Sequence, residues 1–168
     1  MKTRGNKRGL VFVADAMLGK LSRWLRLLGQ KVFFEEASDD ETLKKALREK
    51  AILLTRDENL AAKAGDYVKV TLFKTNDSFK QLRSIMKEFG LKPLDSPSFT
   101  LCPHCGGKIA RVAKEKVRGK VFPRVFRQQK AFWACTECSQ IYWKGSHWAR
   151  ITKKLNGFRK AGRQAKVI

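Results

Sequence analysis

Hydrophobic positions in the first ninety residues follow two alternating patterns. Leu10–Ala14 is a continuous apolar run, which is typical of a strand buried on both faces of a sheet. From Met17 to Leu28 the apolar residues recur at helical spacing, and Gly29 is expected to end that helix. The alternation continues along the chain, and it predicts strands at 31–35, 51–55 and 67–73 and helices at 38–50, 59–64 and 78–90. The helix at 38–50 begins at Ser38, where a capping box with Glu41 is expected.

Strands and helices that alternate over short connections predict a parallel sheet covered by helices, because parallel strands need crossover connections. We therefore expect an α/β domain over residues 9–91. Residues 92–98, rich in Pro and Ser, are the expected linker.

Four cysteines occur as two Cys-x-x-Cys pairs, Cys102 with Cys105 and Cys135 with Cys138. Each pair sets two thiolates on one side of a turn, and two such turns complete the tetrahedral coordination that Zn²⁺ prefers. Two disulfides are the alternative, but no secretory signal is expected, which favours metal. Four protein ligands leave no open coordination position, so the zinc is expected to be structural.

The segment that carries the cysteines, residues 99–150, shows apolar alternation that predicts a β-hairpin or small sheet of the zinc-ribbon type. Residues 151–168 are rich in Lys and Arg and contain no acid, so we expect a basic tail that forms a frayed helix or a disordered arm.

The formal net charge is +22, and it is unevenly distributed. Residues 1–95 hold 20 Lys and Arg against 13 Asp and Glu, whereas residues 96–168 hold 17 against 2. Such a charge repels itself unless a polyanion neutralises it, which favours a nucleic-acid partner but does not distinguish DNA from RNA. A surface adapted for solubility or heat would add Glu along with Lys.

No run of 18 apolar residues is present, so we expect a cytoplasmic protein without a membrane span.

Acidic residues follow the first three predicted strands: Asp15, the pair Asp39 and Asp40, and Asp57. The carboxyl ends of parallel strands lie on one edge of a sheet, where ligands bind. Clustered carboxylates need a cation among them, and oxygen ligands suit Mg²⁺ or Mn²⁺, which can activate water for attack on phosphorus. Helix capping is the alternative for each aspartate, and Asp77 is a possible fourth member. The residues alone leave both interpretations open.

Five motifs, in order over about residues 10–150, resemble the Mut-seven C-terminal ribonuclease family: Asp15–Gly29, Asp39–Glu41, Leu53–Asp57, Cys102–Gly106 and Tyr142–Trp148. The resemblance implies a PIN-like parallel sheet with helices on both faces, followed by a small zinc-ribbon β module. It also implies metal-dependent cleavage of RNA, with Asp15, Asp39 and Asp57 at the acidic positions that hold Mg²⁺ or Mn²⁺. Asp40 is the nearest competitor of Asp39.

Basic residues near these motifs are candidate RNA contacts. Arg56 adjoins Asp57 and has the geometry for a phosphate, and two further basic residues lie on the polar side of the first helix. Basic residues interleaved with aromatics after the second cysteine pair can accompany base stacking. The candidates are Lys20, Arg23, Arg56, Lys144, His147 and Arg150. Exposure to solvent without a ligand is the alternative for Lys20, Arg23 and Arg56. For His147 the alternatives are a structural hydrogen bond and a role as acid for the leaving group.

The leading hypothesis is a Mg²⁺- or Mn²⁺-dependent ribonuclease whose zinc ribbon and basic tail bind RNA, with ribosomal or transfer RNA as candidate substrates. The alternative is a non-catalytic RNA-binding protein of RNA or ribosome maturation. A phosphoacceptor receiver domain also uses acidic residues at strand ends, but this chain has one strand too few for that fold.

Overall fold

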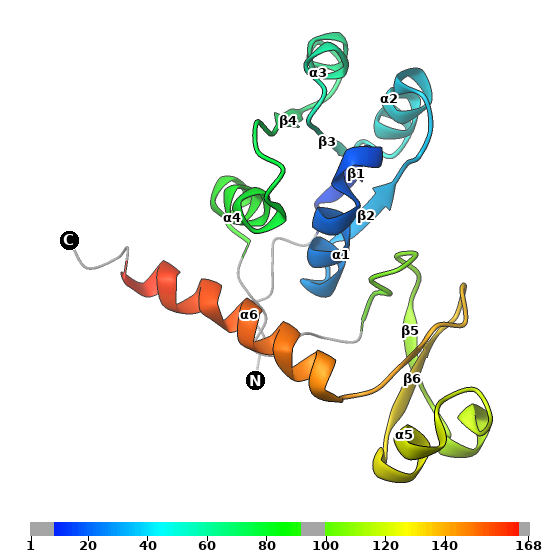
Figure 1. The fold of residues 1–168 in the computed structure, drawn as a ribbon. Helices are drawn as coiled ribbons and strands as arrows, with labels where there is room; N and C mark the ends of the chain where they lie inside the picture. The colour runs from blue at the N-terminus through cyan, green and yellow to red at the C-terminus, as the bar shows by residue number, and fades with distance from the viewer. Residues whose placement is uncertain (1–8, 92–99, 165–168) are drawn as a thin grey trace. The chain divides into compact units, whose positions relative to one another are not determined.

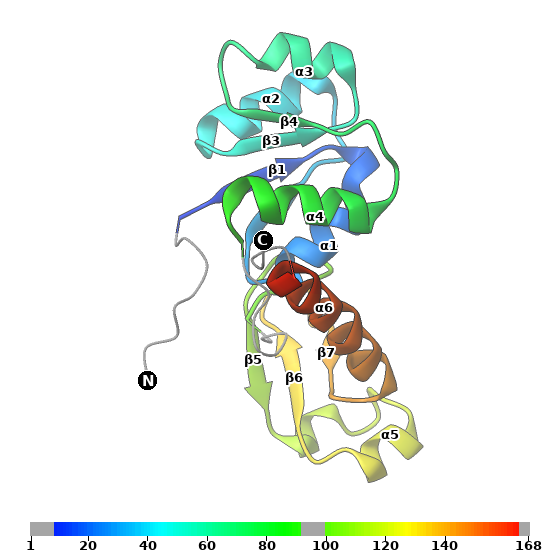
Figure 2. The ribbon, with the colours of Figure 1, turned by 90° about the vertical axis from the view of Figure 1, so that its left-hand side faces the viewer.

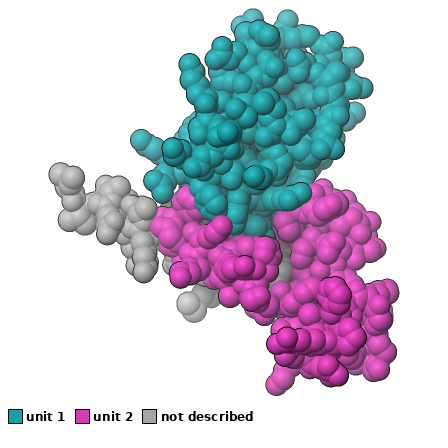
Figure 3. Space-filling view, in the orientation of Figure 1, with its two compact units in different colours: residues 1–92 teal, residues 93–168 magenta. Residues whose placement is uncertain are grey.

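The computed structural model describes residues 9–91 and 100–164 and divides the chain into two compact units, residues 1–92 and 93–168 (Figures 1 and 3). The expected linker, 92–98, and the last four residues of the expected basic tail lie outside the described residues. Among the helices that the structure describes, none combines the length and the apolar character needed to cross a membrane.

The first unit contains a parallel four-stranded sheet, as the strand–helix alternation predicts. Its strands are β1 (Val11–Ala14), β2 (Lys31–Phe34), β3 (Ile52–Thr55) and β4 (Val70–Leu72). They lie in the order β2-β1-β3-β4, and every pair of neighbours is parallel. The chain therefore moves from β1 to one side and then crosses to the other, which places the reversal of strand order between β1 and β3. In open α/β sheets the carboxyl end of such a reversal is where ligands bind.

Helices cover both faces of this sheet (Figure 2). On one face α2 (Asp39–Arg48) and α3 (Glu58–Ala64) bury a shared core with Val13 and Leu53. On the other face lie α1 (Gly19–Leu27) and α4 (Ser78–Phe89), and the ring of Phe12 in β1 meets that of Phe89 at 5.5 Å. The structure confirms the expected α/β fold with helices on both faces.

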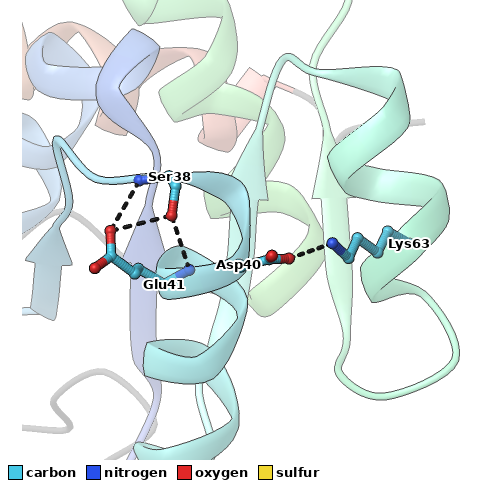
Figure 4. Close-up of polar contacts among 4 residues, drawn as sticks. All are labelled: Ser38, Asp40, Glu41 and Lys63. Atoms are coloured by element: carbon cyan, nitrogen blue, oxygen red, sulfur yellow. Dashed lines mark hydrogen bonds and ion pairs between the residues drawn. The ribbon is translucent and has the colours of Figure 1, made fainter.

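Local signals explain where these helices begin and end. The capping box at the start of α2 is formed: the Ser38 Oγ accepts from the Glu41 backbone N–H, and the Glu41 carboxylate accepts from the Ser38 backbone N–H at 3.2 Å (Figure 4). α4 ends at Gly90, whose φ of 64° is left-handed and is adopted readily by glycine. Both helix boundaries agree with the sequence pattern.

Two residues of the first helical pattern behave differently from expectation. Met17, expected on the apolar face, is 56% exposed because it lies in the 3-10 turn η1 (Ala16–Leu18), whose tighter winding differs in phase from α1. Arg26, which the helical spacing of the apolar residues leaves off the apolar face, is only 4% exposed. Its guanidinium donates to the Val32 carbonyl through Nε at 3.1 Å and Nη2 at 2.9 Å, so it links α1 to the edge strand β2.

The second unit contains a small antiparallel sheet, as expected for a zinc ribbon. Its strands are β5 (Ile109–Val112), β6 (Phe132–Cys135) and β7 (Ile141–Tyr142), in the order β5-β6-β7. The connection between β5 and β6 forms a 3-10 turn, η2 (Lys114–Val117), and a short helix, α5 (Pro123–Gln128). The apolar alternation did not predict this helix.

The C-terminal helix α6 runs from Ser146 to Gln164. It passes without a break across residues 150 and 151, where the sequence suggests a boundary between zinc ribbon and tail. Its Leu155 is buried. Much of the expected tail is therefore helix.

Candidate functional site

Asp15 lies at the carboxyl end of β1, and its side chain is only 7% exposed. Its Oδ1 accepts a hydrogen bond from the backbone N–H of Met17 at 2.9 Å. Its Oδ2 accepts from the hydroxyl of Thr55 and, at 3.3 Å, from the backbone N–H of Arg56. These three donors stabilise the charge of a buried carboxylate and fix its orientation. Because a carboxylate has about four acceptor positions, about one remains for another partner.

Thr55, the last residue of β3, connects Asp15 to the next candidate. It is fully buried, and its hydroxyl donates to Asp15 while it accepts from the backbone N–H of Asp57 at 2.9 Å. The carboxyl ends of the two neighbouring strands are thus held together by one side chain. Thr55 therefore orients the carboxylate of Asp15 in addition to ending β3.

Asp57 follows β3 and caps α3. Its Oδ1 accepts from the backbone N–H groups of Asn59 at 2.7 Å and Leu60 at 2.9 Å. The other oxygen, Oδ2, accepts no hydrogen bond from the part of the chain that the structure describes. Capping thus occupies one oxygen of this carboxylate and leaves the second available.

Asp39 and Asp40 begin α2, and both are exposed. Asp40 pairs with Lys63 of α3 (Figure 4). The hydrogen bond and the charge of Lys63 hold the pKa of Asp40 below its usual value, and the same contact raises the pKa of Lys63. No described residue donates a hydrogen bond to the carboxylate of Asp39. Asp40 therefore forms an ion pair with a residue 23 positions away in sequence, whereas the carboxylate of Asp39 keeps its acceptor positions open to another partner.

The three aspartates do not form a closed cluster in this arrangement. Across residues 9–91 and 100–164, the only close group of three or more acidic, His or Cys ligand atoms is that of the four cysteines. Asp77, considered as a fourth acid, caps α4: its Oδ1 accepts from Phe79 and Lys80, and these backbone hydrogen bonds lower its pKa. At the carboxyl edge of the parallel sheet, Thr55 therefore links Asp15 to the backbone of Asp57. Asp39 lies at the start of α2 and Asp77 at the start of α4.

Three candidate RNA contacts lie in this unit. Lys20 and Arg23 are exposed on α1. Arg56 is half-buried, and its Nε is a buried donor for which the described residues provide no acceptor. Buried donors normally have a partner, so this nitrogen is an exception among the described residues.

The four cysteines of the second unit have the geometry of a metal site. Their sulfurs all lie within 4.8 Å of one another, with Sγ–Sγ distances of 3.7 Å for Cys102–Cys138 and 3.4 Å for Cys105–Cys135. A tetrahedron with Zn–S bonds of about 2.3 Å has edges of about 3.8 Å. None of the four is in a disulfide. The cluster is therefore compatible with structural zinc, as the spacing predicts.

The backbone around the cysteines follows the same plan in both turns. In each turn a backbone N–H two residues after a cysteine points at its sulfur: Gly107 at the second cysteine of its pair, Cys105, and Glu137 at the first of its pair, Cys135, each at 3.4 Å. The residue after the second cysteine of each pair is left-handed, with φ of 86° at Gly106 and 59° at Ser139. Glycine and, at some cost, serine adopt this conformation, which explains the small residues that follow both pairs.

Tyr142 of β7 adds a side-chain donor to the cluster, since its hydroxyl lies 2.9 Å from the Cys102 sulfur. Burial raises the pKa of Cys102, but the hydrogen bonds from Tyr142 and from backbone N–H groups outweigh it and lower the pKa to about 7. Burial and the neighbouring sulfurs raise the pKa of Cys105 to about 12. Thiols this close cannot all ionise without a cation among them, so the donor set fits a doubly charged metal ion.

The remaining candidate RNA contacts come after β7, the last strand of this unit, in the sequence. Lys144 is exposed, and its Nζ lies 5.7 Å from the ring centre of Trp133. His147 and Arg150 are exposed in the first turns of α6. The three residues are accessible and lie within a few residues of one another in sequence.

A family model described as the Mut7-C RNAse domain matches residues 10–155. Neither the comparison with curated proteins nor that with solved structures gave a match. The family description suggests a ribonuclease and implies RNA as the substrate. The match spans both compact units and most of the 168 residues. The chain belongs to the Mut7-C RNAse domain family.

Proposed function

We propose that this chain is a divalent-metal-dependent ribonuclease that hydrolyses RNA phosphodiesters at the carboxyl edge of its parallel sheet. The observation that carries the proposal is the placement of Asp15 and Asp57 after the carboxyl ends of the neighbouring strands β1 and β3, where the strand order reverses. Their connection through the Thr55 hydroxyl supports a common site. Membership of a ribonuclease family supports the reaction class.

The carboxylates of Asp15, Asp39 and Asp57 are the proposed holders of Mg²⁺ or Mn²⁺. Asp15 is oriented by three hydrogen bonds, while the Oδ2 of Asp57 and the carboxylate of Asp39 accept nothing from the described residues. Oxygen donors of this type fit these hard cations. When bound, such an ion supplies a water of lowered pKa and neutralises charge on the leaving oxygen.

Arg56 is the proposed phosphate contact of this site. Its backbone N–H fixes Asp15, and its buried Nε finds no acceptor in the described parts of the chain. A guanidinium binds two oxygens of a phosphate side by side, and Arg56 is half-exposed, so the accessible part of its side chain is proposed to contact RNA. Lys20 and Arg23 of the first unit, and Lys144, His147 and Arg150 of the second, are proposed as further RNA contacts. Zinc held by the four cysteines is proposed to stabilise the second unit.

A non-catalytic RNA-binding protein is the second candidate. It is favoured by one observation, namely that Asp15 and Asp57 both accept backbone hydrogen bonds as helix caps. A capping role alone explains an aspartate at each of these positions.

Cleavage of a labelled single-stranded RNA by the zinc-loaded full chain separates the two candidates. The reaction is run without added metal, with Mg²⁺ and with Mn²⁺, and without a chelator, because a chelator would also remove zinc. We expect cleavage only when Mg²⁺ or Mn²⁺ is added. RNA that is bound but stays intact with every metal would support the non-catalytic RNA-binding protein. Cleavage at the same rate with and without added Mg²⁺ or Mn²⁺ would contradict the proposed chemistry.

A further inference from the structure

The connection between β5 and β6, residues 113–131, is here named the basic arm. The register of these strands pairs Ile109 with Cys135 near the cysteine cluster and Val112 with Phe132 at the other end. The basic arm therefore leaves the sheet at the end opposite the metal site, where Figure 2 shows α5. Neither the zinc cluster nor the aspartates account for it.

The basic arm is strongly and one-sidedly charged. It holds seven Lys and Arg against one acid, Glu115, a net charge of +6. No ion pair among the described residues involves any of the seven. Six of them are exposed: Lys116, Arg118, Lys120, Arg124, Arg127 and Lys130. This much uncompensated charge on one short segment favours a polyanionic ligand.

An aromatic ring projects from the middle of this charge. Phe122 is 76% exposed, the most exposed large hydrophobic side chain among the described residues. Its near neighbours in sequence, Lys120 and Arg124, are both exposed. Single exposed apolar residues are ordinary, but an exposed ring flanked by unpaired cations is the arrangement that holds unpaired bases and their phosphates.

The ring is held on an ordered scaffold. Phe122 is the N-cap of α5, Pro123 fixes the first helical position, and the Phe122 carbonyl accepts from Phe126 at 3.0 Å. Val117 is buried and anchors the preceding turn. Lys114 and Arg118 lie 4.9 Å and 5.1 Å from the ring centre of Phe126. A surface already ordered loses less entropy when a ligand binds.

We propose that the basic arm is a binding surface for single-stranded RNA, in which Phe122 stacks on an unpaired base while the surrounding Lys and Arg contact phosphates. The choice of RNA rests on the proposed function, and the arm adds to it a preference for unpaired substrate. A single ring without an apolar stripe is a poor fit for a lipid surface, which takes an extended apolar face. A double-stranded partner keeps its bases stacked inside the helix, out of reach of Phe122.

The test measures binding alone, with the full zinc-loaded chain and no added Mg²⁺ or Mn²⁺, so its outcome is independent of cleavage. A fluorescein-labelled single-stranded oligouridylate is titrated and its anisotropy recorded. Phe122→Ala is expected to weaken binding by about 5- to 160-fold, the range that corresponds to loss of one stacked base. Phe122→Tyr is expected to bind like the unmodified chain, because the ring is retained.

Tyr67, 67% exposed in the first unit, provides the matched control, and Tyr67→Ala is expected to leave the affinity unchanged. The doubly substituted Arg124→Gln, Arg127→Gln variant should reduce the slope of log K against log salt by about 1.4, since each lost contact with a single strand contributes about 0.7. This variant also keeps the proposal testable if Phe122→Ala fails to retain zinc.

Three results would overturn the proposal. One is Phe122→Ala binding the oligouridylate as tightly as the unmodified chain. Another is an equal loss of affinity for an RNA duplex of the same length. The third is that Phe122→Ala loses binding to vesicles containing phosphatidylserine while its affinity for RNA stays unchanged. That result would assign the basic arm to lipid.

Discussion

Thr55 donates a hydrogen bond from its hydroxyl to the carboxylate of Asp15, and so joins the ends of β3 and β1. The same oxygen accepts from the backbone N–H of Asp57 at 2.9 Å. One buried hydroxyl therefore sets the position of two acidic residues that are 42 positions apart in the sequence. This contact is the direct side-chain link between the two strand ends that carry Asp15 and Asp57.

Replacing Thr55 by Val keeps the shape of the side chain and removes the hydroxyl. Asp15 then loses a donor, and the Asp57 N–H loses its acceptor inside the protein. We expect the free energy of unfolding to fall by about 1–3 kcal/mol, the cost of leaving buried polar groups unpaired. Metal-dependent cleavage of RNA should fall as well. Urea unfolding and single-turnover cleavage measure the two effects.

Thr55→Ser is the matched control for this substitution. It keeps the hydroxyl and removes only a methyl group, so cleavage should be retained while stability falls by about 1 kcal/mol. A valine variant as active as the serine variant would show that the Thr55 hydroxyl does not organise the site.

Asp39 and Asp40 offer a test with two neighbouring residues. Asp40 is committed to Lys63, whereas Asp39 accepts nothing from the described residues. We expect Asp39→Asn to lower the rate of Mn²⁺-dependent cleavage and Asp40→Asn to leave it close to that of the unmodified chain. The rates are compared at equal protein concentration with a saturating single-stranded RNA. The opposite order of effects would make Asp40 the ligand.

Tyr142→Phe tests the side-chain donor of the cysteine cluster. The substitution removes the hydroxyl that lies 2.9 Å from the Cys102 sulfur. Loss of such an outer hydrogen bond costs about 10- to 100-fold in metal affinity, and we expect zinc affinity to fall on that scale. Competition with a chromogenic chelator measures it. Tyr67→Phe removes an exposed hydroxyl far from any cysteine in sequence and should change nothing; equal affinities for all three proteins would contradict the role given to Tyr142.

Removal of zinc should affect the two units differently. The second unit has a sheet of only three short strands. Its four cysteine sulfurs lie within 4.8 Å of one another, and a bound cation offsets the repulsion between their thiolate charges. The first unit has its own core on both faces of a four-stranded sheet. We expect amide NMR signals of residues 100–158 to collapse after zinc removal while those of residues 9–91 persist. Signals that persist throughout would show that the second unit folds without metal.

Much of the fold is readable from the sequence because local signals agree with it. The apolar runs at Val11–Ala14 and Ile52–Thr55 are strands, the capping box at Ser38 is formed, and the paired cysteines meet. Arg26 is the counterexample: its burial depends on a carbonyl of β2, six residues away in sequence and on another element, and no helical pattern encodes that.

The candidate site is readable only in part. Strand ends predict that Asp15 and Asp57 share an edge, but not that backbone N–H groups occupy some of their oxygens. The ion pair of Asp40 depends on the packing of α2 beside α3, which one sequence does not reveal. Helix α5 is only six residues long, too short for a reliable periodic signal.

The most direct measurement compares Mn²⁺-dependent cleavage of single-stranded RNA by the unmodified chain, Asp15→Asn and Asp66→Asn. Asp66 is exposed and precedes β4, on the opposite edge of the parallel sheet, so its variant makes the same change of charge away from the site. The account predicts that Asp15→Asn, folded by circular dichroism, loses at least about a hundredfold in rate, the scale on which a positioned catalytic group acts. Asp66→Asn should cleave at the unmodified rate. Equal cleavage by all three proteins would contradict the account.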